Sequence, residues 1–153
     1  MELINPQSLS KRKLNELIQS LGGKYTFWER LKLRGIGIGG LELKIEENPN
    51  IPLKYKGATE SVKVSIEPLK KGLILSFNNT KELKWYVAHN PKMDIQLEKR
   101  PLSHQSRATS PPLEIRLMIQ EDMFILHTSG WNNKSVVQYF QKLPALCTQS
   151  HQA

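Results

Sequence analysis

The sequence has one cysteine, few aromatic residues and no long hydrophobic run. A single cysteine, Cys147, allows neither a disulfide within the chain nor a cysteine-based zinc site, and this fits a reducing compartment. The longest apolar stretches, such as residues 73–75, are far shorter than the roughly 20 residues that span a bilayer. The first residues also lack the apolar segment of a secretory signal. We therefore expect a cytoplasmic protein without a transmembrane segment.

Sequence motifs of catalysis and of metal binding are missing as well. The four histidines are His89, His104, His127 and His151, and their positions fit neither HxxxH nor HExxH spacing. No Gly-x-Ser-x-Gly elbow is present. His127 follows Ile125 on one face of its strand, and we interpret it as a barrel-rim or satisfied buried histidine. We predict that the protein is not an enzyme and has no cofactor and no metal site.

What the chain does have is the size and composition of one globular domain. Its 153 residues are enough to bury a core, and 39% hydrophobic and 24% charged residues are ordinary for a soluble protein. The net charge of +8 attracts anionic partners, namely nucleic acid, acidic lipid or an acidic protein. A basic but unspecialised surface is equally compatible with it, because the charges are not clustered along the chain.

Hydrophobic periodicity predicts a helix near the N-terminus, over residues 7–21. Apolar residues recur on one face of this segment: Leu14, Leu17, Ile18 and Leu21. Ser8 or Ser10 can cap the start of the helix, and Gly22 with Gly23 ends it.

After this helix the hydrophobic period changes to two, which is typical of strands. The strands are predicted around residues 62–66, 73–77, 83–87, 93–97, 113–119 and 123–128. The connections contain Gly, Asn, Asp and Pro, which form tight turns, so we predict an antiparallel meander with one buried face. We expect Trp85 to face the core and Tyr86 to face the opposite side.

A run of glycines in RGIGIGGLELKIEE (residues 34–47) raises the question of a phosphate-binding loop. Dinucleotide and P-loop motifs need a helix after the glycines. Here residues 41–47 alternate as a strand does, so we exclude that interpretation. The apolar positions are odd at Leu31 and Leu41 but even at Ile36 and Ile38. We predict one long strand, bent or bulged at the glycines, and a ligand or second backbone against the glycine face is the open alternative.

The last predicted element is a helix over residues 133–143. Its apolar face consists of Val136, Val137, Phe140 and Leu143, and Pro144 is expected to end it. We expect residues 145–153, including Cys147, to be a flexible tail, and the whole helix to close one end of the sheet as a plug.

A long bent strand, six further strands and a C-terminal helix resemble the pleckstrin-homology-like fold. The likeness to small uncharacterised bacterial proteins of that type rests on GLILSFNNT (72–80), LKWYV (83–87) and Asn133-Lys134. It implies a mainly β, seven-stranded antiparallel bent barrel over residues 24–144, capped by the C-terminal helix and preceded by an added N-terminal helix (residues 1–23). The basic pattern of phosphoinositide-binding members is incomplete here, because Lys44 is followed by Lys54-Tyr55-Lys56 without the final arginine.

Two function classes follow from these observations. The first is a non-catalytic binding or scaffold module for a protein, a peptide or an acidic lipid head group. Its predicted site lies in two basic inter-strand loops and consists of Lys54, Tyr55, Lys56, Arg100 and Arg107. The alternative is a nucleic-acid-binding protein that uses its basic surface, against which stands the low aromatic content of 7%.

Overall fold

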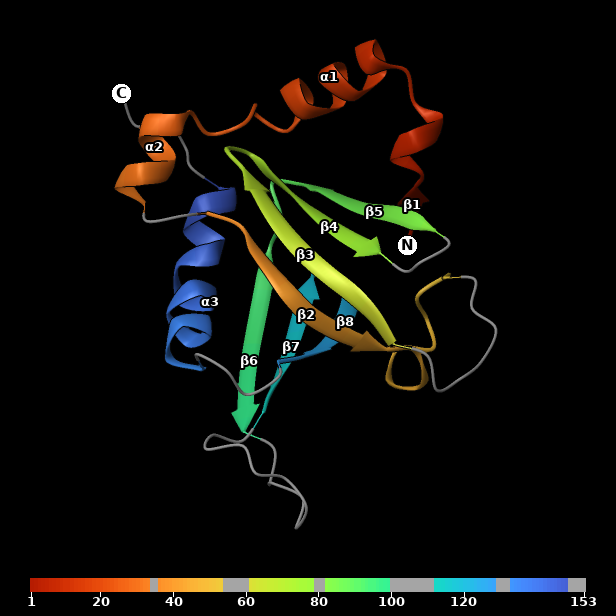
Figure 1. Cartoon of the computed structure of the whole chain (residues 1–153), viewed down its shortest axis with the longest axis vertical. Helices are drawn as coiled ribbons and strands as arrows, with labels where there is room; N and C mark the ends of the chain where they lie inside the picture. The colour runs from red at the N-terminus through yellow and green to blue at the C-terminus, as the bar shows by residue number, and fades with distance from the viewer. Residues whose placement is uncertain (34–35, 54–60, 79–81, 100–111, 129–132, 149–153) are drawn as a thin grey trace.

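The computed structural model of the chain describes residues 1–33, 36–53, 61–78, 82–99, 112–128 and 133–148. The elements in chain order are β1 (Leu3–Ile4), the 3-10 helix η1 (Pro6–Ser8), α1 (Lys11–Ser20), α2 (Phe27–Lys32), β2 (Ile38–Lys44), the 3-10 helix η2 (Ile45–Glu47), β3 (Ser61–Leu69), β4 (Gly72–Asn78), β5 (Leu83–His89), β6 (Met93–Lys99), β7 (Leu113–Ile119), β8 (Asp122–His127) and α3 (Asn133–Cys147) (Figure 1). The prediction of a mainly β chain is confirmed.

The strands form a single antiparallel sheet in the order β1-β5-β4-β3-β2-β8-β7-β6. Strands β2 to β5 make one meander, β6 to β8 make a second, and pairing of β2 with β8 joins the two. The sheet is open, because β1 and β6 lie at its two ends and no pairing joins them among the described strands. The predicted count of seven strands is one too few, since Leu3 and Ile4 add β1 to the edge of β5.

The sheet curves strongly, so that its two meanders face each other across the core (Figure 1). The ring of Phe124 on β8 stacks on that of Phe77 on β4, with centroids 5.8 Å apart, although β3 and β2 separate these strands in the sheet. The same ring meets Tyr86 on β5 edge-on at 4.9 Å. In addition, the hydroxyl of Tyr86 donates a hydrogen bond of 2.8 Å to Asp122 on β8.

The core follows the predicted alternation on most strands. Val62, Val64 and Ile66 of β3 are buried, whereas Lys63 and Ser65 between them are exposed. Inward-facing apolar residues of the other strands complete this core: Leu41, Leu43, Leu73, Leu75, Phe77, Leu113, Ile115, Leu117, Ile119, Phe124 and Leu126. Burial of this shared face is the main favourable contribution to folding.

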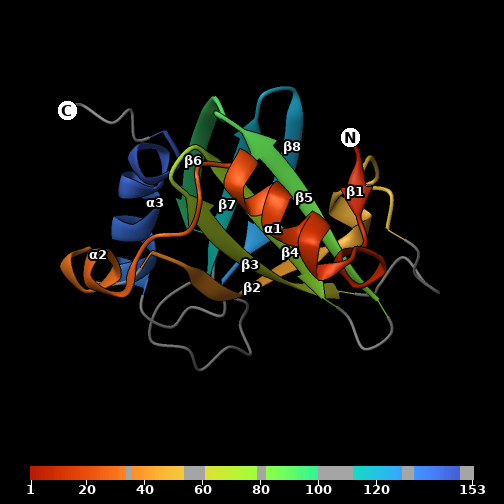
Figure 2. The same ribbon diagram turned by 90° about the horizontal axis from the view of Figure 1, so that it is seen from above.

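Helix α1 packs on the outer face of β4 and β5 (Figure 2). Ser10 is its cap, because its side chain accepts a hydrogen bond of 3.2 Å from Lys13 N–H. The helix therefore starts at Lys11, later than predicted. The prediction that Trp85 faces the core is wrong, because its side chain packs beneath α1, whereas Tyr86 is buried in the core. An apolar residue on the outer face is tolerated there because α1 covers it.

The glycine-rich stretch contains a bulge as predicted, but β2 is shorter than the predicted strand. Between the pairs Ile38–Ile66 and Leu41–Val64, β2 advances three residues and β3 only two. Gly40 has φ +74°, a conformation that favours glycine. The predicted strand around Leu31 is wrong, because residues 27–32 form α2.

Helix α3 packs against β3 and β6, and its apolar face joins the core. The predicted end at Pro144 is wrong, because the helix continues to Cys147. Proline removes one N–H donor only three residues before the helix ends. Burial of Leu146 and Cys147 and a hydrogen bond of 2.5 Å from Tyr25 Oη–H to the Leu146 carbonyl stabilise the last turn. Cys147 is therefore in the core and not in a tail.

Replacement of Phe140 tests whether α3 is structural. Phe140 is buried in the core, so Phe140→Ala should lower the free energy of unfolding by roughly 3–5 kcal/mol. Urea unfolding followed by circular dichroism measures this loss, with Gln141→Ala, an exposed neighbour, as the matched control. A loss below about 1 kcal/mol would show that the helix is peripheral.

The thiol of Cys147 should be inert in the folded protein. Burial raises its pKa to about 12, and the thiolate is the reactive form. The unfolded chain loses this proton near pH 8.5, so the stability contributed by the neutral thiol is complete below that pH and is lost as the pH rises towards about 12. We expect iodoacetamide at pH 8 to label Cys147 only after denaturation, measured by mass spectrometry. Rapid labelling of the native protein would contradict this.

Candidate functional site

The residues that the sequence singled out for binding lie outside the described part of the chain. Lys54, Tyr55 and Lys56 belong to residues 54–60, and Arg100 and Arg107 to residues 100–111. Their placement in two basic loops therefore stays a prediction, and a candidate site has to be built from other residues.

Among the described residues, the large hydrophobic side chains with the highest exposed fractions lie on α2. Phe27 is 66% exposed, Trp28 72% and Leu31 55%, and none of the residues of α2 is buried. At 100° per residue these three side chains lie within about one third of the helix circumference. We call Phe27, Trp28 and Leu31 the α2 apolar face. Exposed apolar clusters of this kind mark interaction sites.

Short-range contacts hold α2 in place although it buries nothing itself. Thr26 and Glu29 form a capping box, with hydrogen bonds of 3.2 Å and 3.0 Å between the side chain of each and the backbone N–H of the other. Lys70 forms an ion pair of 3.2 Å with Glu29. The hydrogen bond from Thr26 N–H and that from Lys70 lower the pKa of Glu29. After the helix, Leu33 packs against the buried Tyr25, Ile36 and Leu146.

Basic side chains lie beside this apolar face. Arg30 and Lys32 occupy the last turn of α2. The guanidinium of Arg30 is 3.9 Å from the carboxylate of Glu67, a loose pair in which both side chains are more than 40% exposed, so water screens it. Lys142 of α3 donates a hydrogen bond of 3.1 Å to the Leu33 carbonyl at the end of α2. An apolar surface next to cationic side chains fits an anionic partner with an apolar part.

A groove of about 310 Å³ adjoins α2 and includes the glycine stretch. Its lining residues are Arg30, Ile36, Gly37, Ile38, Gly39, Ser65, Ile66 and Glu67. A Cβ atom at Gly39 would meet no atom within 4 Å, so packing does not require a glycine there. The bare backbone leaves the groove open, and the alternative of a ligand on the glycine face is therefore still available.

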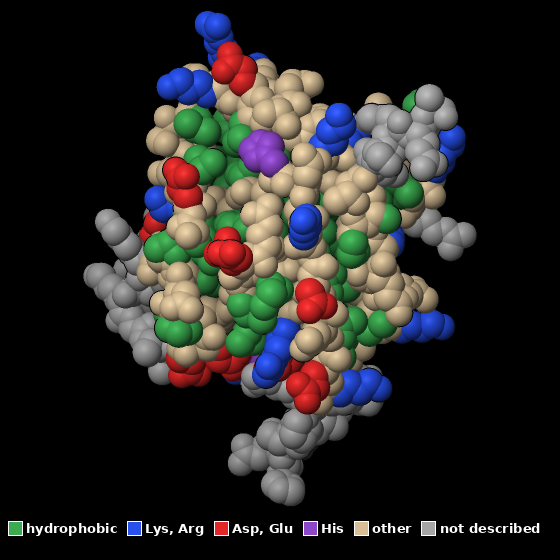
Figure 3. All heavy atoms as spheres, turned by 180° about the vertical axis from the view of Figure 1, so that it is seen from behind, with side chains coloured by type: hydrophobic (Ala, Val, Ile, Leu, Met, Phe, Trp, Pro, Cys, Tyr) green, Lys and Arg blue, Asp and Glu red, His purple; other side chains and the backbone are tan. Residues whose placement is uncertain are grey.

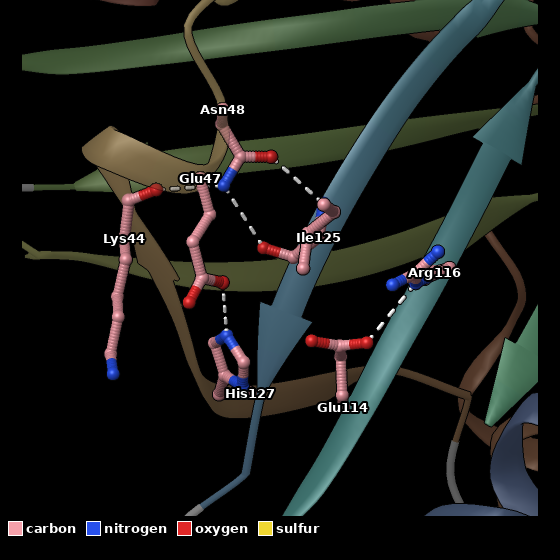
Figure 4. A network of polar contacts seen from close by, with 7 residues as sticks. All are labelled: Lys44, Glu47, Asn48, Glu114, Arg116, Ile125 and His127. Atoms are coloured by element: carbon pink, nitrogen blue, oxygen red, sulfur yellow. Dashed lines mark hydrogen bonds and ion pairs between the residues drawn. The ribbon is translucent and has the colours of Figure 1, made fainter. Parts of the chain in front are cut away.

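A second group of polar residues lies where β2 ends, on the outer face of the sheet (Figure 4). Asn48 follows η2, and its side chain bonds both backbone groups of Ile125 on β8, accepting from N–H at 2.8 Å and donating to C=O at 3.1 Å. It also donates to the Lys44 carbonyl at 2.8 Å. The amide of Asn48 thus extends the short β2–β8 ladder by a side chain.

Next to Asn48, Glu47, Glu114 and His127 come together, and we call them the acid–histidine cluster. His127 Nε2 is 2.5 Å from Glu47 Oε2, and Glu114 accepts a hydrogen bond of 3.0 Å from Arg116 Nε. His127 is 6% exposed, so the interpretation of a satisfied buried histidine is confirmed, in preference to a rim position.

Sequence reasoning found no metal-ligating cluster, yet the structure brings these three potential ligands together. The sequence of the β7–β8 hairpin does predict that two of the three residues lie together. Counting outward from the Ile119–Asp122 pair at its tip places Glu114 opposite His127. The approach of Glu47 from η2 depends on tertiary contacts and leaves no such signal.

Comparison of the chain with family models, with curated proteins and with solved structures finds no match. No helix within the described residues is long and apolar enough to cross a membrane. The function has to be argued from the two sites alone.

Asn48 should be important for stability because its amide replaces backbone partners of a buried strand. Asn48→Ala leaves the N–H and C=O of Ile125 without these bonds, and we expect a loss of about 2–3 kcal/mol in the free energy of unfolding. Asn48→Asp retains the acceptor and loses the donor, so it should also destabilise. Asn50→Ala, at an exposed position, is the control in chemical denaturation, and an equal effect of Asn48→Ala and Asn50→Ala would contradict the assignment.

Proposed function

We propose that the protein is a non-catalytic binding module that docks through the α2 apolar face onto an anionic lipid surface. One observation is the basis of this proposal: a helix held at both ends exposes Phe27, Trp28 and Leu31 beside cationic side chains. Because the flanking contacts fix α2, docking would require little ordering of the chain.

The chemistry of this surface suits the boundary between head groups and acyl chains. Tryptophan, phenylalanine and leucine favour this region, and arginine and lysine interact with lipid phosphates. Each basic residue near an anionic surface contributes about 1 kcal/mol. Full burial of each large apolar side chain contributes roughly 1.5–3 kcal/mol. A few such contributions give reversible attachment. The neighbouring groove, with Arg30 at its wall, offers space for a phosphate-bearing head group.

We further propose that the fold is pleckstrin-homology-like, with β2 to β8 as its seven-stranded bent barrel. The order β5-β4-β3-β2-β8-β7-β6 and the terminal helix α3 against β3 and β6 support this interpretation. Strand β1 and helix α1 are then additions at the N-terminus. Fold-level likeness does not specify a ligand, so the proposed partner rests on the α2 apolar face and not on the fold.

Nucleic acid remains the alternative partner, but the described surface gives it less support. On the side shown in Figure 3, acidic, basic and hydrophobic side chains are interspersed, and no extended region of one charge is visible. The exposed aromatic rings among the described residues, Phe27 and Trp28, are both on α2 and do not form the row along a basic groove that single-strand binders use.

Replacement of the two exposed aromatic residues tests the proposal. Phe27→Ser with Trp28→Ser should weaken binding to vesicles of phosphatidylcholine and phosphatidylserine at least tenfold, since about 1.4 kcal/mol corresponds to a factor of ten. The melting temperature should hardly change, because both side chains are exposed. Co-sedimentation measures the binding, and Met123→Ser, at an exposed residue of β8, is the control.

Further variants separate the possible partners. Lys54→Glu with Lys56→Glu asks whether the predicted basic loops contribute. Undiminished vesicle binding of this double variant would remove them from the site. A random oligonucleotide tests the alternative function, and its binding should disappear with modest added salt. If the wild-type protein binds the oligonucleotide and not the vesicles, the lipid proposal is wrong.

A further inference from the structure

The acid–histidine cluster gathers three metal-binding side chains from three separate elements. Glu47 comes from η2, Glu114 from β7 and His127 from β8, and one donor atom of each lies within 4.8 Å of the others. In Figure 4 the carboxylate of Glu47 points at His127, and one carboxylate oxygen of Glu114 is on the side of His127. The α2 apolar face is not involved, and nothing in the proposed function requires this arrangement.

Burial distinguishes the cluster from acidic residues on an ordinary surface. The side chains of His127 and Glu114 are 7% and 8% exposed, and that of Glu47 is 21% exposed. Glu42 lies opposite His127 on β2, but it is exposed and does not belong to the cluster. Like charges brought together away from water repel each other unless a cation compensates them. Arg116 pairs with one oxygen of Glu114, and His127 contacts Glu47.

We propose that Glu47, Glu114 and His127 form a binding site for a divalent metal ion, with zinc as the ion that the donors fit best. Zinc accepts both kinds of donor present here, namely one imidazole nitrogen and two carboxylate oxygens. A tetrahedral zinc ion with bonds of about 2.0–2.2 Å holds its ligand atoms roughly 3.4 Å apart. Donors that already lie within 4.8 Å of one another reach this spacing by rotation of the two glutamate side chains.

The ion lies between His127 Nε2 and Glu47 Oε2 and replaces the hydrogen bond that joins them. In this complex the imidazole has its proton on Nδ1 and offers the Nε2 lone pair to the metal. Glu114 binds through the oxygen that does not contact Arg116, which points towards His127 in Figure 4. Arg116 stays on the second oxygen and orients the carboxylate, as residues behind a metal ligand commonly do.

Three protein ligands leave one tetrahedral position for water. The partly exposed Glu47 marks the side on which solvent can reach the ion. Because Glu47 belongs to η2 and the other ligands to β7 and β8, a bound ion fastens η2 to the second meander. It therefore reinforces the connection that Asn48 makes through Ile125.

Zinc titration of the full-length protein, purified without a histidine tag and treated with a chelator, tests this site. We expect calorimetry to detect one equivalent of Zn²⁺ and the melting temperature to rise on its addition. Glu114→Gln and His127→Gln should each weaken binding at least tenfold, the lower end of what loss of a supporting residue costs. Bound Co²⁺ should give visible absorption that is lost in both variants.

The control is His89→Gln, because His89 is an exposed histidine on β5 that contacts Ser20 and not the cluster. It should bind zinc as the wild type does. Glu47→Gln, at a partly exposed position, provides a second variant if His127→Gln does not fold, as judged by circular dichroism. Absence of stoichiometric binding in the wild type overturns the proposal. Zinc binding in Glu47→Gln and Glu114→Gln that is as strong as in the wild type, or a loss of binding in His89→Gln, overturns it as well.

Discussion

Pairing of β2 on both of its edges is the constraint on which the rest of this structure depends. Along one edge β2 continues the first meander through β3, and along the other it meets β8 of the second meander. The β2–β8 register contains only two residue pairs, Glu42–His127 and Leu43–Leu126. A ladder of this length would fray easily, and Asn48 extends it through the backbone of Ile125. The bulge at Gly40 reverses the face of β2, so that Ile38 and Leu41 both point inwards.

The three helices differ in how much of the curved sheet they cover, and this difference determines which apolar surface is left exposed for binding. Helix α1 covers the outer face of β4 and β5, and α3 adds its apolar side to the core between β3 and β6. Helix α2 covers nothing and is held by its cap, by Lys70 and by the cluster around Leu33. An apolar face that is fixed in position but not buried gains no hydrophobic stabilisation on folding. Such a face gains it when a partner covers it.

The two candidate sites differ in the kind of interaction that they offer. At α2 the contacts are apolar and exposed, and charge acts only at the rim through residues such as Arg30. In the acid–histidine cluster the interacting groups are charged or polar and mostly buried. Each interaction partner is important for stability there, because an uncompensated charge away from water is costly. Arg116 and the Glu47–His127 contact provide this compensation in the described structure. Neither site is built from residues of the predicted basic loops, which lie outside the described part of the chain.

The sequence by itself determined strands β2 to β8, the turns before β4, β6 and β8, a serine cap for α1 and the bulge in β2, because these follow from alternation and from local hydrogen bonding. It also contained the Thr26-x-x-Glu29 capping signal of α2, although the alternation of Leu31 and Leu33 indicated a strand there. Only the tertiary structure decided that Trp85 lies under α1 and that Cys147 is buried. It also decided that Glu47 reaches His127. The reason is physical: periodicity shows which residues share a face, but the partner of that face comes from distant parts of the chain.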